Sequence, residues 1–245
     1  SRAQRVKRKL TQDGTVDNIS RRCILIKKVA GMDVWYHGSI YKFDTFPIFT
    51  HFGTEKAGMD AIGKQLRRHP RDRNGGFRHS NLTVTAPRLH AVEFTEKKWP
   101  KASKDFGSTT KLALAKALDD ICGYSRNNGY FIQFYEHHHQ IMKGKEKNEI
   151  DHELHFNLDG VRDAFLAKGI KAFLYPNNVE DRGSISLCVV SPNLAGLTRL
   201  SYTELSREDL ESSLAGTFFD PQQHIDNMSF NKCWEIAYPE PDVTE

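Results

Sequence analysis

The chain has 245 residues, of which 38% are hydrophobic and 27% are charged, and its formal net charge is +4. This composition is typical of a folded globular protein and excludes an intrinsically disordered or collagen-like chain. No apolar run approaches the roughly 18 residues that a membrane helix needs, and no apolar core of a signal peptide follows the basic first residues. We therefore expect a cytoplasmic protein with no membrane partner.

The pattern of apolar residues predicts strands at 23–29, 34–36, 88–94, 170–174 and 184–190, and helices at 55–68, 109–121, 158–168 and 201–215. Thr54 is the predicted N-cap of the first helix, and Gly169 ends the third. The aromatic segment 130–142 fits either class, and the tail from Phe218 is expected to fray. Because strands and helices do not alternate as regular βαβ units, the sequence favours an α+β fold.

Three segments are predicted along the chain: a basic arm with the first strand at 1–30, a catalytic domain at 31–200, and a helix with a tail at 201–245. Five basic residues of the arm precede its first acid, Asp13, namely Arg2, Arg5, Lys7, Arg8 and Lys9, and an arginine-rich loop lies at 69–81. Such clusters can neutralise the phosphates of a nucleic acid, or they can form a solvated basic surface.

The cysteines and histidines do not suggest a metal site. The four cysteines are widely spaced without a CxxC pair, which disfavours zinc and suits reduced buried thiols, with a disulfide left open. His137, His138 and His139 are consecutive, and neighbouring residues of a strand point to opposite faces, so they cannot readily converge on one ion. The chain also lacks a P-loop and a GxGxxG motif, which disfavours nucleotide hydrolysis and hydride transfer on a Rossmann fold.

A first candidate segment runs from 33 to 54, where an apolar strand meets the polar residues His37, Gly38 and Ser39. His37 can donate a hydrogen bond to ribose or carboxamide oxygens, and Gly38 allows the backbone to approach a flat ligand closely. Nearby aromatic residues, among them Tyr36 and Phe52, can stack on a nicotinamide ring, although most of them are expected in the core. A structural histidine at the end of a strand is the alternative.

A second candidate segment runs from 175 to 190, where Glu180 lies in a polar turn just before a strand. Its polar neighbours are Asn177, Asn178, Ser184 and Ser186. A carboxylate beside the nicotinamide ribose of NAD can hold the 2′-hydroxyl and stabilise the oxocarbenium-like state that forms when the glycosidic bond breaks. A solvated loop acid is the alternative.

The motifs of these two segments together resemble the ADP-ribosyltransferase fold. The residues that carry the resemblance are Y-H-G-S at 36–39, F-x-x-F at 43–46, T-H-F-G-T at 50–54 and Y-x-N-x-x-E-D-x-G-S-x-S at 175–186. They look most like bacterial and phage toxins of the diphtheria-toxin and poly(ADP-ribose) polymerase type. The resemblance implies split, twisted antiparallel sheets with flanking helices and with NAD bound between the sheets.

The resemblance also implies roles for individual residues. His37 would orient NAD through ribose contacts, Gly38 would hold the carboxamide through its backbone, and Glu180 would be the catalytic glutamate. Tyr36, Ser39, Phe52 and Ser184 are further candidate NAD-binding residues. The tyrosine that the family stacks on nicotinamide has no clear counterpart, since His51 and Phe52 follow the first motif here.

The expected function is therefore that of a mono-ADP-ribosyltransferase toxin or effector, with NAD as substrate and no metal. Its acceptor would be RNA, DNA or protein, and the basic segments slightly favour a nucleic acid. An inhibitor or antitoxin protein is a further expected partner, and delivery into the cytoplasm of a target cell is the alternative to a cytoplasmic location. The competing hypotheses are a catalytically inactive binding module of the same fold and an NAD glycohydrolase.

Overall fold

The computed structural model describes residues 34–42, 44–68, 84–125, 127–145, 149, 158–224 and 228–239. All the described residues belong to one compact unit, Asp33–Glu245. The basic arm, the predicted strand at 23–29 and the arginine-rich loop at 69–81 lie outside the described residues.

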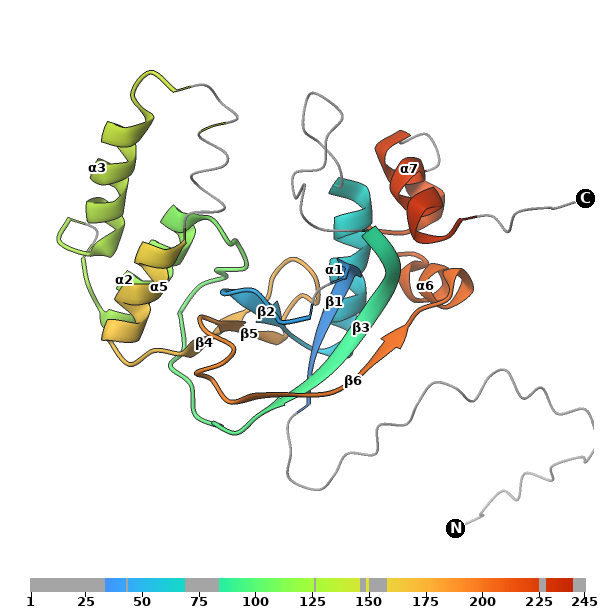
Figure 1. Ribbon diagram of the computed structural model, residues 1–245, viewed down its shortest axis with the longest axis horizontal. Helices are drawn as coiled ribbons and strands as arrows, with labels where there is room; N and C mark the ends of the chain where they lie inside the picture. The colour runs from blue at the N-terminus through green and yellow to red at the C-terminus, as the bar shows by residue number, and fades with distance from the viewer. Residues whose placement is uncertain are drawn as a thin grey trace, which may run out of the picture. The chain divides into compact units, whose positions relative to one another are not determined.

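The strands of this unit form two three-stranded sheets (Figure 1). The first sheet has the order β1-β3-β6 and consists of Trp35–Tyr41, Val84–Phe94 and Leu197–Glu204. The second has the order β2-β5-β4 and consists of Thr50–Phe52, Ile185–Val189 and Ala172–Pro176. All pairs within the sheets are antiparallel, which agrees with the α+β class and not with a doubly wound parallel sheet.

The helices are α1 (Glu55–Arg68), α2 (Lys111–Cys122), α3 (Tyr130–Met142), α5 (Asp159–Ala167), α6 (Arg207–Leu214), the short 3₁₀ helix η1 (Pro221–His224) and α7 (Met228–Ala237). The predicted start of α1 is confirmed, because Thr54 Oγ1 accepts a hydrogen bond from the backbone N–H of Ala57 at 3.1 Å. Gly169 follows α5 with a φ of 71°, a left-handed conformation that suits the predicted helix end.

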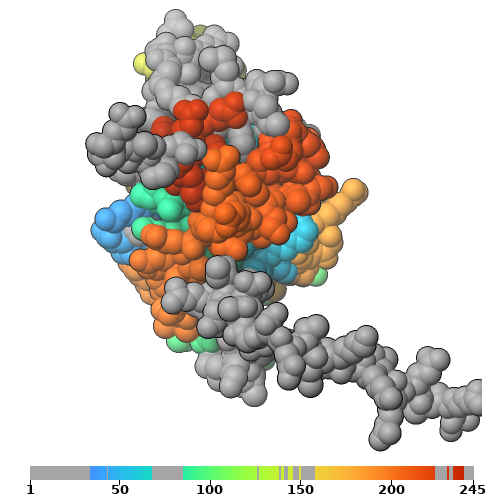
Figure 2. All heavy atoms as spheres, turned by 90° about the vertical axis from the view of Figure 1, so that its right-hand side faces the viewer, coloured from blue at the N-terminus to red at the C-terminus, as the bar shows by residue number. Residues whose placement is uncertain are grey.

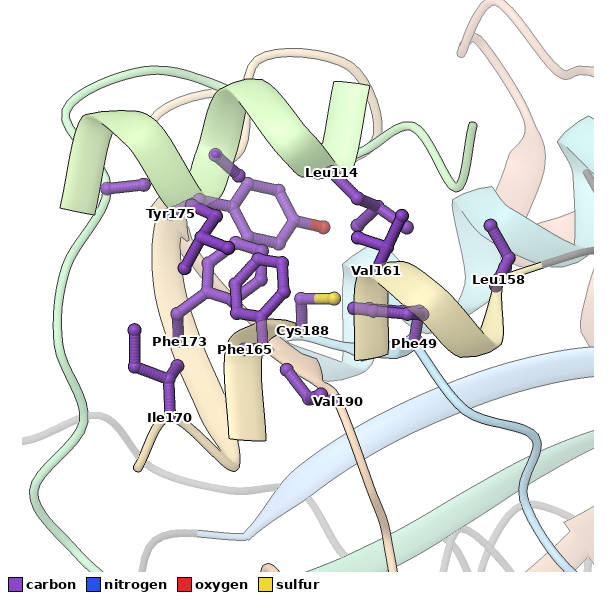
Figure 3. Close-up of a cluster of buried hydrophobic side chains, with 13 residues drawn as sticks. Phe49, Leu114, Leu158, Val161, Phe165, Ile170, Phe173, Tyr175, Cys188 and Val190 are labelled. Atoms are coloured by element: carbon purple, nitrogen blue, oxygen red, sulfur yellow. The ribbon is translucent and has the colours of Figure 1, made fainter. Parts of the chain in front are cut away.

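Three clusters of buried side chains hold these elements together. Helices α1, α6 and α7 share one cluster with β1 and β3, built on residues such as Ile62, Leu89 and Leu214, and Figure 2 shows α6 and α7 beside α1 on one face. Helices α2 and α5 cover the second sheet through Phe165, Phe173 and their neighbours (Figure 3). A third cluster joins the two sheets through Phe52, Val92, Phe94, Ala172, Leu187 and Val189, together with Phe46 and Ala195 from outside the strands.

The strand predicted at 34–36 was too short, since β1 runs from Trp35 through Gly38 to Tyr41. A Cβ atom on Gly38 would lie 1.9 Å from the carbonyl oxygen of Gly58 in α1. Glycine is therefore required here because the backbones of the strand and the helix approach each other closely, and not because the chain turns.

Other predicted boundaries were wrong where distant parts of the chain decide the structure. Strand β3 begins at Val84 and not at 88, and the ambiguous segment 130–142 is helical. The helix predicted from 201 begins only at Arg207, because the preceding residues pair with β3 as strand β6. The tail folds as α7, whose Trp234 is only 7% exposed, so burial against α1 stabilises a segment that was expected to fray.

Candidate functional site

The two motifs of the first candidate segment lie side by side where the sheets meet. Tyr36 and Gly53 exchange two backbone hydrogen bonds of 2.9 Å, which link β1 to the end of β2. His37 Nδ1 lies 2.7 Å from the carbonyl oxygen of His51. Because a carbonyl oxygen only accepts, His37 Nδ1 carries the hydrogen and donates it.

His37 is a neutral ring at physiological pH. Burial lowers its pKa to about 4, and the Arg199 guanidinium acts in the same direction, while the hydrogen bond to His51 acts against them. With the hydrogen on Nδ1, the Nε2 atom of the neutral ring is a hydrogen-bond acceptor. A ribose hydroxyl would therefore have to donate to His37, whereas the sequence suggested that His37 would donate to the ligand.

His37 belongs to a group of aromatic and imidazole rings on one side of the first sheet. It pairs across the strands with His90, and burial lowers the pKa of His90 to about 3. The centroids of the Phe46 and Phe52 rings each lie 5.5 Å from that of His37. Packing on several sides thus holds the imidazole of His37 in one orientation.

His51 and Tyr175 form a second polar contact, between β2 and β4. His51 Nδ1 lies 2.9 Å from the Tyr175 hydroxyl oxygen. Burial lowers the pKa of His51 to about 3, with His37 and Lys64 acting in the same direction, and burial raises the pKa of Tyr175 well above its usual value. His51 Nε2 is buried and meets no hydrogen-bond partner in the part of the chain that the structure describes.

Glu180 lies in the turn between β4 and β5, and the side chain of Asn177 organises that turn. Asn177 is 2% exposed, and its Oδ1 accepts hydrogen bonds of 3.0 Å from the backbone N–H groups of Val179 and Glu180. Its Nδ2 donates to Ser186 Oγ at 2.9 Å. This pattern is an Asx-type turn anchored to strand β5, so the backbone of Glu180 has a defined position.

The same turn is tied to helix α1. Thr54 Oγ1 donates to Asp181 Oδ2 at 2.6 Å, and Lys64 Nζ donates to Glu180 Oε1 at 2.5 Å. One residue further along α1, Gln65 Oε1 accepts from the N–H of Ile40 at 3.1 Å, and Gln65 Nε2 donates to the carbonyl oxygen of Gly38 at 2.9 Å. Consecutive residues of α1 therefore contact Glu180 and the strand that carries His37.

The other predicted site residues are packed or hydrogen-bonded within the fold. Phe52 is 1% exposed and packs in the cluster between the sheets, as we expected for most of these aromatic residues. Ser39 Oγ accepts from the N–H of Tyr41 at 3.0 Å, and Tyr36 packs against the cluster around α1. Ser184 Oγ is buried and meets no hydrogen-bond partner among the residues described.

Sequence reasoning missed Lys64, Gln65 and Tyr175 as neighbours of the site. Lys64 and Gln65 lie in the predicted helix at 55–68 and received no role, and Tyr175 entered only as the first residue of the motif at 175–186. Their contacts join residues that are far apart along the chain, for example 116 positions for Lys64 and Glu180. No local pattern of residue types could have indicated them.

Within the described ranges, no group of three or more histidine, cysteine, aspartate or glutamate residues is arranged to hold a metal ion. None of the described helices has both the length and the apolar character that crossing a membrane requires. A comparison of the chain with protein-family models, with curated proteins and with solved structures finds no significant match.

Proposed function

We propose that the chain is a mono-ADP-ribosyltransferase, which cleaves NAD at the nicotinamide bond and transfers ADP-ribose to a macromolecule. The observation that carries the proposal is the pair of contacts from α1, because Lys64 and Gln65 connect Glu180 with the strand of His37. Glu180 and His37 were chosen from separate sequence motifs, and residues of the single helix α1 contact the surroundings of both. The two antiparallel sheets are compatible with the split-sheet fold that the resemblance predicts.

The proposed chemistry assigns distinct roles to the two residues. The Glu180 carboxylate accepts a hydrogen bond from the 2′-hydroxyl of the nicotinamide ribose and stabilises the positive charge that develops at C1′. The bond from C1′ to the nicotinamide nitrogen breaks, and nicotinamide leaves with the electron pair. A nucleophile of the acceptor then forms a bond to C1′, and its proton passes to water. His37, with a neutral ring, accepts a hydrogen bond from a ribose hydroxyl and orients the substrate.

We propose a nucleic acid as the acceptor in preference to a protein, because the basic residues of the arm and of the loop at 69–81 can contact phosphates. An inhibitor protein remains a proposed partner, since an enzyme that consumes NAD in its own cell requires restraint. These parts of the proposal rest on the sequence, because the arm and the loop lie outside the described residues.

The test is the release of nicotinamide from NAD by the wild type and by Glu180→Gln, a variant that keeps the shape of the side chain and removes its charge. We expect the substitution to lower kcat by about 100-fold or more. Glu96→Gln is the matched control, because Glu96 forms an exposed ion pair with Lys171, and it should retain full activity. Release by Glu180→Gln at the wild-type rate would refute the assignment of the catalytic glutamate.

A second measurement identifies the acceptor. NAD labelled in its adenylate phosphate is incubated with the wild type and a cell lysate that is untreated or treated with nuclease or with protease. We expect nuclease to remove the label from macromolecules, whereas removal by protease would identify a protein acceptor. Nicotinamide release without transferred label would identify an NAD glycohydrolase. A wild type that releases no nicotinamide would refute the enzyme and favour the inactive binding module.

A further inference from the structure

The backbone and the carboxylate of Glu180 have separate supports. The backbone is held by Asn177 and by the bond between Asp181 and Thr54. The carboxylate is contacted through Oε1 by Lys64, and no other described side chain forms a hydrogen bond or an ion pair with it. The turn therefore defines where the side chain of Glu180 begins, and Lys64 defines where it ends.

The contact between Lys64 and Glu180 is partly shielded from water. The side chains are 22% and 14% exposed, respectively, so the hydrogen bond joins two charged groups in a region of reduced dielectric constant. The other lysine of α1 close to this turn, Lys56, is directed to a different carboxylate, since its Nζ lies 2.5 Å from Asp60 Oδ2. Lys56 reaches Glu180 only at its backbone carbonyl oxygen, at 3.4 Å.

Lys64 is itself fixed relative to His37. Helix α1 lies against β1 at the close approach of Gly58 to Gly38, and the neighbouring Gln65 makes hydrogen bonds to β1 on either side of Ser39. A movement of Lys64 along the strand would break these contacts. The backbone of Lys64 therefore has a fixed position relative to the strand that carries His37.

We propose that Lys64 is a positioning residue, which holds the Glu180 carboxylate at a fixed place relative to the strand of His37. The role of Glu180 in catalysis rests on the proposed function, whereas the positioning itself rests on the contacts above. Lys64 contacts Oε1, and the second carboxylate oxygen, Oε2, is left to accept a hydrogen bond from the ribose 2′-hydroxyl. Lys64 does not touch the reacting atoms in this arrangement, and its effect is transmitted through Glu180.

The kinetic test compares Lys64→Met, Lys64→Arg and the wild type in the release of nicotinamide. We expect Lys64→Met to lower kcat by roughly 10- to 100-fold, because a misplaced catalytic group loses that much rate, while the KM for NAD changes by less than about threefold. Lys64→Arg, which keeps the charge, should recover most of the loss. Lys171→Met is the matched control, since it removes a lysine from an exposed ion pair, and it should behave as the wild type.

A merely structural role for Lys64 would give a different result. Lys64→Met would then lower the melting temperature, while its kcat would stay equal to that of the control Lys171→Met. Lys64→Gln is the second variant if the methionine substitution prevents folding. Wild-type kcat in a folded Lys64→Met or Lys64→Gln would overturn the proposal.

Crystal structures of the wild type and of Lys64→Met provide a readout that does not depend on turnover. We expect the Glu180 carboxylate to move by about 1 Å or more while the backbone of the turn stays in place. A carboxylate that keeps its position would overturn the inference even if the enzyme is active. A wild type that releases no nicotinamide, together with a displaced carboxylate, would refute the proposed function and support the positioning by Lys64.

Discussion

Mild acid should destabilise this fold, because three neighbouring histidines are held in the neutral state. The pKa of His37 is lowered to about 4, and those of His51 and His90 to about 3, in each case mainly by burial. In the unfolded chain each histidine has its ordinary pKa of 6.5. A histidine with a lower pKa in the folded state takes up a proton on unfolding, so the free energy of unfolding decreases as the pH falls below about 6.5.

The size of the effect follows from these pKa values. At pH 5 an unfolded histidine is almost fully protonated while His37 and His51 remain neutral, which lowers the free energy of unfolding by about 2 kcal/mol for each residue. The two together contribute roughly 4 kcal/mol, a large part of the 5–15 kcal/mol that is typical of a domain. His90 acts in the same direction. Asp60 acts in the opposite direction, because burial raises its pKa and its protonation favours the folded state.

Urea unfolding at pH 7, 6 and 5, followed by tryptophan fluorescence, measures this dependence. The variant His51→Gln should lose about 2 kcal/mol of the difference between pH 7 and pH 5. His139→Gln is the matched control, because His139 is exposed on α3, and it should retain the full difference. A wild type whose free energy of unfolding differs by less than about 1 kcal/mol between pH 7 and pH 5 would refute the neutral, buried state of these histidines.

Two further substitutions test the support of the site. Gly38→Ala should reduce the free energy of unfolding by at least about 3 kcal/mol, because its Cβ would lie 1.9 Å from the Gly58 carbonyl oxygen. Gly160→Ala is the control, since its Cβ meets only an ordinary contact at 3.5 Å. Its free energy of unfolding in the same urea titration should stay within about 1 kcal/mol of that of the wild type. Equal stability of the two variants would contradict the close packing of strand and helix. Asn177→Ala removes the acceptor of two backbone N–H groups, and we expect faster hydrogen exchange in the β4–β5 turn with a loss of about 2 kcal/mol. Unchanged exchange in this turn would show that Asn177 does not organise it.

Local sequence patterns were sufficient for the elements that depend on local interactions. Thr54 and the apolar positions of residues 55–68 predicted α1, and its start agrees with the observed N-cap. The apolar run at 184–190 predicted β5, which spans Ile185–Val189. The polar turn around Glu180 was likewise readable, because asparagine and glycine at a strand end favour a turn.

Patterns failed where a distant segment determines the conformation. Residues 201–204 were predicted as the start of a helix, and they form part of strand β6 because β3 offers its backbone groups for pairing. Trp234 lies in a tail that no local signal stabilises, and it is buried against the α1 cluster. Lys64 lies within the predicted helix at 55–68, and no local pattern indicated its contact with Glu180.

By itself, the sequence determined the α+β class, the first helix and the two segments that carry His37 and Glu180, because capping, periodicity and turn formation act over a few neighbouring residues. The tertiary structure decided three properties of these segments, namely the neutral state of His37, the packing role of Gly38 and the contact of Lys64 with Glu180. Each of these depends on burial or on an approach between segments that are far apart in the chain, and neither is encoded in the pattern of adjacent residues.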